Sequence, residues 1–194
     1  MASVVFFRAA NVGGYQVFQP AKLARELESF GAANIGAAGT MVIRDNIGET
    51  KLRSEILRRL HFEPELMICP AGEVLELLQT KMFRDKPEGN EVSRFVSMLS
   101  KPPGKRLALP IEAPAAQPWE IRIVAVVGRF ALTLRRPGRK GLYSNEVVEK
   151  NLGIPATTRS WNTIEAICKI LNSPESAGPK TTRSRSSKKA SRVS

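Results

Sequence analysis

The sequence predicts an α+β protein, and three observations lead to this fold class. Short apolar runs typical of β-strands alternate along the chain with runs whose apolar residues recur at helical spacing. In the first half the order is strand, helix, strand, strand, helix, strand, which is that of a ferredoxin-like, or split βαβ, half. The 194 residues, 42% hydrophobic and 25% charged, have the composition of an ordinary globular protein with one large or two small domains.

The first half, residues 1–83, is predicted to be the ferredoxin-like subdomain. Its elements are a strand at 4–10, a helix from Pro20 to Gly31, strands at 33–37 and 41–44, a helix opened by Thr50, a strand at 65–69 and a short helix at 73–79. The first strand is apolar on both faces, as expected of a central strand. Leu23, Leu27 and Phe30 share one helical face, and Gly31 is the expected C-terminal cap.

The second half, residues 84–172, is predicted to be another α+β subdomain packed against the first. Its elements are strands at 92–99 and 107–111, a loop at 112–118, a hairpin of 119–127 and 129–134 around Gly128, a helix opened by Ser144 or Asn145 and ended by Gly153, and a last helix opened by a capping box at 162–165. The pattern at 92–99 is also compatible with a helix; we favour a strand.

The net charge of +12 is unevenly distributed. Residues 173–194 hold six basic residues against one acid, which places +5 in this tail and leaves +7 on the rest of the chain. The tail has too few apolar residues to fold, so we expect it to be disordered. It attracts phosphate backbones or merely aids solubility. Its candidate nucleic-acid-binding residues are Lys180, Arg183, Arg185, Lys188, Lys189 and Arg192.

Two short polar segments carry the candidate binding residues. In the first, Arg8 and Asn11 follow the first strand beside Gly13 and Gly14. A cation, an amide and an unobstructed backbone suit a phosphate or carboxylate, although the glycines on their own indicate no more than a turn. This is neither a dinucleotide-binding nor a P-loop motif.

In the second segment, residues 156–163, Arg159 offers a bidentate donor and Trp161 a stacking face next to a helix N-terminus. Helix capping and core packing are the favoured explanation for Asn162, Thr163 and Trp161, whereas capping gives no reason for an arginine at position 159. If Arg8 and Arg159 serve a ligand, their replacement by alanine should leave folding nearly intact. A large loss of stability in both variants would assign them to structure.

Several chemistries find no support in the sequence. The single histidine, His61, is expected at a helix end on the surface, and Cys69 and Cys168 are expected in the core, so we predict no metal site and no cofactor. No nucleophile motif is present. The chain has no apolar stretch long enough to span a bilayer and does not begin with a signal peptide, so we expect a cytoplasmic protein.

The two polar segments also carry a family resemblance. The run from Phe7 to Gly14, followed by a helix and by Ala38-Gly39-Thr40, resembles the first half of the bacterial family called domain of unknown function 1697. Tyr143, Glu149, Leu152-Gly153 and the segment 156–163 resemble its closing signature. The similarity covers residues 4–171 and implies a bacterial cytoplasmic α+β protein with a ferredoxin-like half and no established activity.

This chain departs from the family pattern at three places. It has Ala9-Ala10 where the family usually shows Gly followed by Ile or Val, and Ala38-Gly39-Thr40 where the family shows Ser-Gly-Asn. It has Ser160 where Asn is common. The second change removes a hydroxyl and an amide from a polar corner, so a site shared by the family would be altered here.

Three functions remain open. Binding of an anionic ligand, nucleic acid favoured, ranks first by a small margin because +7 remains on the body. The second is an enzyme acting on a small phosphorylated or carboxylated metabolite, and the third is a protein-interaction module. A pocket joining Arg8 and Arg159 would favour the second, and an exposed apolar patch the third. The aromatic sheet signature of RNA-recognition domains is missing.

Overall fold

The computed structural model confirms an α+β fold made of two antiparallel sheets and five α-helices within the residues that it describes. Those residues are 1–10, 17–80, 83, 92–105, 107–115, 118–137 and 143–173. Asn11, Gly13 and Gly14 lie outside them, as do residues 174–194 with the basic side chains of the predicted tail.

The first sheet has the strand order of a ferredoxin-like half. Its strands are β1 (Ser3–Arg8), β2 (Ala32–Ile35), β3 (Thr40–Ile43) and β4 (Glu65–Pro70), in the order β2-β3-β1-β4 with every pair antiparallel. Because β1 is central, its side chains alternate between two buried faces, with Val4 and Phe6 on one and Val5 and Phe7 on the other. The predicted ferredoxin-like strand order is confirmed.

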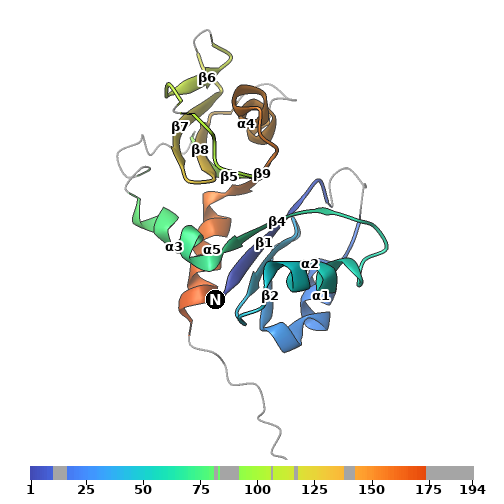
Figure 1. Cartoon of the computed structure of the whole chain (residues 1–194). Coiled ribbons are helices and arrows are strands. Elements are labelled where there is room, and N and C mark those ends of the chain that lie inside the picture. Colours follow the sequence, from blue (N-terminus) through green and yellow to red (C-terminus); the bar gives the residue numbers. More distant parts are fainter. Residues whose placement is uncertain are drawn as a thin grey trace, which may run out of the picture.

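Helices α1 (Pro20–Glu26) and α2 (Glu49–Leu57) cover the outer face of this sheet (Figure 1). Two details of the prediction were wrong. The first helix ends at Glu26, and a separate 3₁₀ turn, η1 (Glu28–Phe30), is the one that Gly31 closes with φ of 63°. Helix α2 is capped by Gly48 and not by Thr50, because an acidic Glu49 is favourable in the positively polarised first turn.

The second sheet has the order β6-β7-β8-β5-β9. Its strands are β5 (Ser93–Leu99), β6 (Ile111–Ala113), β7 (Ile121–Val127), β8 (Phe130–Arg135) and β9 (Ala156–Ser160). The hairpin turn at Gly128 is confirmed by a φ of 55°. The predicted strand at 107–111 was wrong, and the predicted loop at 112–118 was wrong at 112 and 113. Strand β6 occupies only the three residues between Pro110 and Pro114, because these prolines lack the N–H that pairing requires.

Strand β9 is the main element that the sequence did not predict. Residues 156–160 pair with β5, so that Arg159 lies opposite Val96 and Ser160 opposite Phe95. Helix α5 (Trp161–Asn172) therefore begins at Trp161 with Ser160 as its N-cap, and the expected capping box at 162–165 was wrong. Once Ser160 ends the strand, the chain turns directly into the helix and leaves no room for a later start.

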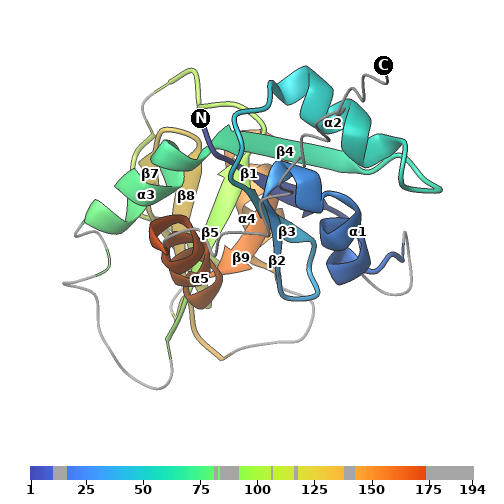
Figure 2. The ribbon, with the colours of Figure 1, turned by 90° about the horizontal axis from the view of Figure 1, so that it is seen from below.

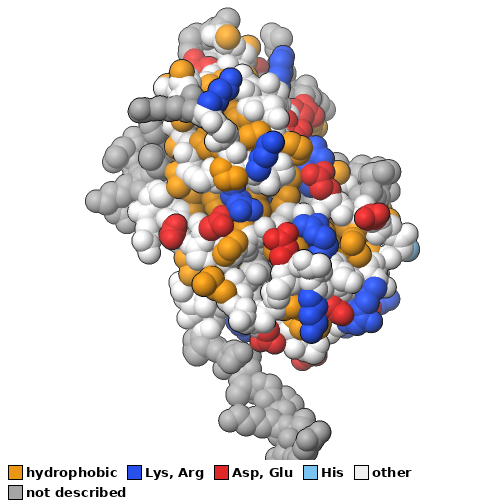
Figure 3. Space-filling model, viewed as in Figure 1, with side chains coloured by type: hydrophobic (Ala, Val, Ile, Leu, Met, Phe, Trp, Pro, Cys, Tyr) orange, Lys and Arg blue, Asp and Glu red, His pale blue; other side chains and the backbone are white. Residues whose placement is uncertain are grey.

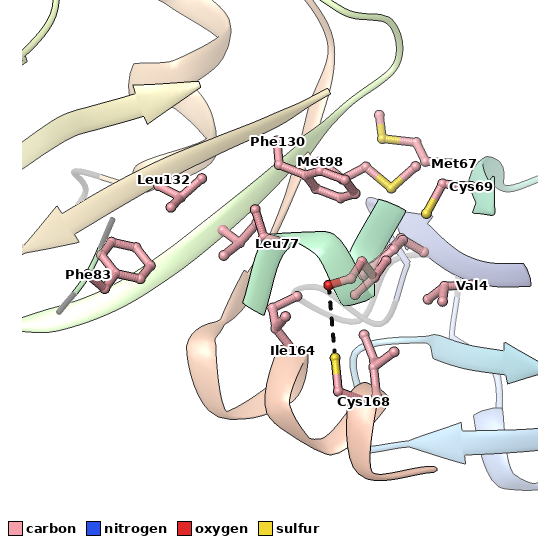
Figure 4. Packing of buried hydrophobic residues seen from close by; sticks show 14 of the residues in the cluster. Val4, Met67, Cys69, Leu77, Phe83, Met98, Phe130, Leu132, Ile164 and Cys168 are labelled. Atoms are coloured by element: carbon pink, nitrogen blue, oxygen red, sulfur yellow. Dashed lines mark hydrogen bonds between the residues drawn. The ribbon is translucent and has the colours of Figure 1, made fainter. Parts of the chain in front are cut away.

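The two sheets share one core. Helices α3 (Ala71–Gln79) and α5 lie between them, and α4 (Ser144–Leu152) packs on the outer face of the second sheet (Figures 1 and 2). Leu77 of α3 and Ile164 and Cys168 of α5 point toward one another in this layer (Figure 4), where Cys168 Sγ lies 3.9 Å from the Val74 carbonyl oxygen. Both cysteines are buried free thiols, as predicted.

Candidate binding site between the two sheets

The end of β1 meets β9 at a pocket of about 600 Å³ between the two sheets, here called the interface pocket. Its walls include Phe7, Arg8, Ala9 and Ala38 from the first sheet and its loops, Thr157, Thr158 and Arg159 from β9, and Tyr143, Asn145 and Glu146 from the start of α4. The pocket therefore joins Arg8 and Arg159, which are separated by about 150 residues in the sequence.

Arg159 is buried, with 8% of its surface exposed, and its guanidinium ties β9 to the first sheet. Its hydrogen-bond acceptors are the carbonyl oxygens of Phe7 (2.9 Å), Ala38 (2.8 Å), Gly39 (3.1 Å) and Thr158 (2.9 Å) and the hydroxyl oxygens of Thr40 (2.7 Å) and Thr157 (2.9 Å). Each of the five guanidinium hydrogens can thus find an acceptor within the protein. The Arg159 side chain therefore connects the two sheets through hydrogen bonds.

Every one of these acceptors is electrically neutral. In the described part of the chain, no carboxylate lies within ion-pair distance of Arg159. Burial lowers the pKa of Arg159 to about 10, which still leaves it charged at neutral pH. The wall of the pocket therefore holds a buried positive charge without an acidic partner.

Arg8 is placed differently, because it pairs with two acids. Its Nη1 donates to Glu65 Oε2 at 2.5 Å, and its Nε and Nη2 donate to Glu149 Oε1 at 3.2 and 2.9 Å. Glu149 also accepts the backbone N–H of Ala156 at 2.7 Å, so this carboxylate connects α4, β9 and β1. Partial burial opposes the charge of Arg8, but the hydrogen bonds to Glu149 and Glu65 outweigh it and raise the pKa of Arg8.

Two backbone positions shape the corner beside these arginines. Gly39 has φ of +66°, and a Cβ there would lie 2.8 Å from the Cβ of Phe7, so no larger residue fits. Ala9 has φ of +55°, a conformation that is unfavourable for alanine. The family pattern has glycine at this position, where a positive φ causes no strain. Alanine in its place therefore strains the backbone of this chain. Thr40, at the third position of the altered corner, supplies a buried hydroxyl that accepts from Arg159.

Asn11, Gly13 and Gly14 lie outside the described residues, and the structure does not bring Trp161 to this pocket. Trp161 lies in a second pocket, between α3, α5 and the start of β5, where its ring meets Phe83 edge to face at 5.0 Å. Sequence reasoning missed Thr157, Asn145 and Glu146 as pocket residues. Recognising β9 as a strand would have found Thr157, because alternate residues of a strand share a face and Arg159 is two positions away.

The described residues give no support to a metal site or a membrane-spanning helix. Among them, no three histidine, cysteine, aspartate or glutamate side chains come together as a metal site would require. His61 is exposed at the end of the turn after α2, as predicted for a surface residue. No helix in the described part of the chain is both long and apolar enough to cross a membrane.

Comparison with known proteins identifies the family. The model of the family described as protein of unknown function DUF1697 matches residues 1–127. The chain belongs to this family. The DUF1697 match includes Arg8 and the Ala38-Gly39-Thr40 corner but ends before β9. The resemblance of the closing segment 156–163 to the family therefore lies outside the matched residues.

The DUF1697 chain is also similar to the solved structure of a conserved bacterial protein from Streptococcus pneumoniae. The two share 14% sequence identity with a TM-score of 0.56, over 88% of this chain and 98% of the other. At this identity the likeness shows a common fold. The comparison with curated proteins found no match.

Proposed function

We propose that the protein binds a small phosphorylated or carboxylated molecule in the interface pocket. The observation that carries the proposal is the buried charge of Arg159, which lines the pocket without an acidic partner among the described residues. Burying a charge is unfavourable, and neutral hydrogen-bond acceptors offset this only in part. A bound anion would supply the missing opposite charge.

Arg8 is the residue that we expect to touch this anion. It lines the same pocket, and 31% of its side chain is exposed. Each of its two terminal nitrogens carries two hydrogens and donates to one carboxylate in the described part of the chain. One hydrogen on each nitrogen therefore remains for the ligand, in the fork geometry that suits carboxylate and phosphate oxygens.

The start of α4 favours the same kind of ligand and limits its charge. Tyr143 and Asn145 line the pocket at the N-terminus of this nine-residue helix, where the helix dipole and free N–H groups favour an anion. Glu146 lines the pocket as well and opposes a second negative charge. We therefore expect a molecule with one anionic group and a neutral or cationic remainder. The volume of about 600 Å³ is that of a small-molecule site.

Nucleic-acid binding is a second candidate function, favoured by the six basic residues in 173–194. The first sheet does not provide the stacking surface, since Phe6 and Phe7 are each 1% exposed. Acidic and basic side chains are interspersed on the face in Figure 3, so the basic tail would have to supply the attraction.

We also propose that the protein resides in the cytoplasm, because a reducing compartment suits two free thiols.

Thermal unfolding with added small anions tests the interface pocket. Inorganic phosphate, acetate, glycine and citrate serve as probes, and a ligand that binds only the folded state raises the melting temperature further as its concentration exceeds its Kd. We expect singly charged probes to raise it more than citrate. Arg8→Met should abolish the rise measured against its own ligand-free baseline, whereas the control Arg58→Met, which changes an exposed ion-paired arginine just after α2, should keep it.

Equal shifts in Arg8→Met and in the unchanged protein would contradict the proposal, as would the absence of any shift at millimolar concentrations. Catalysis forms no part of this proposal, since the pocket shows binding groups and no nucleophile paired with a base.

A further inference from the structure

We propose that the second pocket is a base-stacking site for single-stranded nucleic acid. This α3–α5 pocket has a volume of about 1020 Å³ and is lined by Leu78, Thr80, Phe83, Arg94, Trp161 and Lys169, among others. It shares no described residue with the interface pocket. The site deepens the second candidate function and does not depend on a ligand at Arg8.

Trp161 provides the stacking surface. It is the first residue of α5 and is only partly buried, and an edge-to-face contact with the buried Phe83 fixes its ring. A tryptophan held in this way offers an aromatic face at little further entropic cost, and stacking on such a face is tolerant of base identity. The strands of the first sheet carry no exposed ring, and among the described residues that line the α3–α5 pocket Trp161 has the partly exposed ring that stacking requires.

Cationic side chains lie on the walls of the same pocket. Lys169 is eight residues after Trp161 on α5, which places both on one face of the helix, and Arg94 enters from the start of β5 with its guanidinium 5.8 Å from the Phe83 ring. Glu165 lies between the two on the α5 face. Among the described lining residues Arg94 and Lys169 are basic and Glu165 is acidic, and basic side chains suit the phosphates that flank a stacked base.

The position of the tail makes nucleic acid the favoured occupant over a free nucleotide. Ser173, the last described residue, itself lines the pocket, and the following 21 residues carry the six basic side chains of the tail. The segment of the sequence with the strongest cluster of positive charge therefore follows directly on a residue of the stacking site. A free nucleotide needs the pocket alone, whereas a strand longer than the pocket gains from the tail as well.

Tryptophan fluorescence offers a direct test, because the chain has only two tryptophans. Trp119 is 2% exposed, and the guanidinium carbons of Arg122 and Arg136 lie 4.2 and 4.0 Å from the centroid of its ring. Trp119→Phe in the full chain leaves Trp161 as the sole reporter. We expect titration with a thymidine oligomer of about 12 nucleotides to quench Trp161, since this length fits the site sizes of single-strand binders.

Two further variants separate stacking from charge. Trp161→Leu should weaken binding about tenfold or more with an unchanged salt dependence, and Trp161→Phe should recover part of the affinity. Replacing the six tail cations by glutamine in the full chain should instead reduce the slope of log affinity against log salt by about 4. Lys150→Gln, an exposed cation on α4, and Arg8→Met should bind like the unchanged protein, which separates this site from the interface pocket.

Several results would overturn the inference. They are binding of the oligomer without any change in Trp161 fluorescence, unchanged affinity in Trp161→Leu, and no binding even at low salt. Adenosine monophosphate binding as tightly as the oligomer would reassign the pocket to a free nucleotide. Circular dichroism of the two Trp161 variants checks that the fold is intact, and if Trp161→Leu does not fold, Trp161→Phe with the fluorescence titration decides the question.

Discussion

Replacement of Arg159 by alanine is the most informative perturbation of this structure. The change removes the six hydrogen bonds that Arg159 donates, two within β9 and four to Phe7, Ala38, Gly39 and Thr40 of the first sheet and its loop. Four of the acceptors are backbone carbonyls, which are unfavourable when buried and unpaired. Water entering from the interface pocket would solvate some of them, so we take about 1 kcal/mol for each bond, or about 6 kcal/mol in all.

The removal of a buried charge acts in the opposite direction. Burial lowers the pKa of Arg159 from 12.5 to about 10. At about 1.4 kcal/mol per pH unit, the desolvation of the charged form costs about 3 kcal/mol, which the variant regains. We therefore expect Arg159→Ala to reduce the free energy of unfolding by about 3 kcal/mol, a large part of the stability of a typical domain.

Urea unfolding at neutral pH, followed by circular dichroism and by tryptophan fluorescence, measures this loss. Arg8→Ala should cost about 1 kcal/mol, because its ion pairs are partly exposed, and Arg58→Ala just after α2 should cost less. The two arginines of the pocket would then separate, Arg159 acting mainly in structure and Arg8 toward a ligand. A loss below about 1 kcal/mol in Arg159→Ala, comparable with that of Arg58→Ala, would refute this reasoning.

Backbone geometry and burial lead to three further predictions. Gly39→Ala should destabilise the protein by about 2 kcal/mol or more in the same urea assay, because its φ is positive and the new Cβ would overlap Phe7; near-neutral stability would show that the corner has room for a methyl group. Ala9→Gly should raise the melting temperature, with a gain of about 0.5–1 kcal/mol from relief of its left-handed conformation, and a decrease would argue against strain there. Burial raises the pKa of Cys69 to about 12 and of Cys168 to about 11. Both thiols should therefore be unreactive toward a disulfide reagent at pH 8 until urea unfolds the chain. Rapid reaction in the folded protein would show that the core opens.

The first sheet could be predicted from the sequence because its signals are local. In β1, apolar residues fill both faces, and a central strand is the simplest structure with two buried faces. Strand β9 could not be predicted in the same way. Its inward side chains, Thr157 and Arg159, meet carbonyl and hydroxyl groups of the other sheet, so the strand is buried without the apolar alternation that marks most strands.

The candidate site was predicted in its residues more than in its arrangement. Arg8 and Arg159 stood out as cations in polar segments, but nothing in the local sequence distinguishes an arginine paired with two glutamates from one bound to carbonyl groups. That distinction depends on contacts between residues about 150 positions apart. The same holds for Trp161, whose place in another pocket follows from the start of α5 directly after β9.

The location of α5 has a consequence for synthesis on the ribosome. The strands of the first sheet are complete when residue 70 has emerged, but one face of that sheet is covered by α5, which ends at Asn172. Helix α3 supplies part of the packing around Val4, Phe6 and Val42, and the rest is missing until α5 leaves the exit tunnel. The nascent N-terminal half therefore keeps part of an apolar sheet face exposed for most of its translation, a state prone to aggregation. Chains that stop before α5 would keep this part open and should depend on chaperones for solubility.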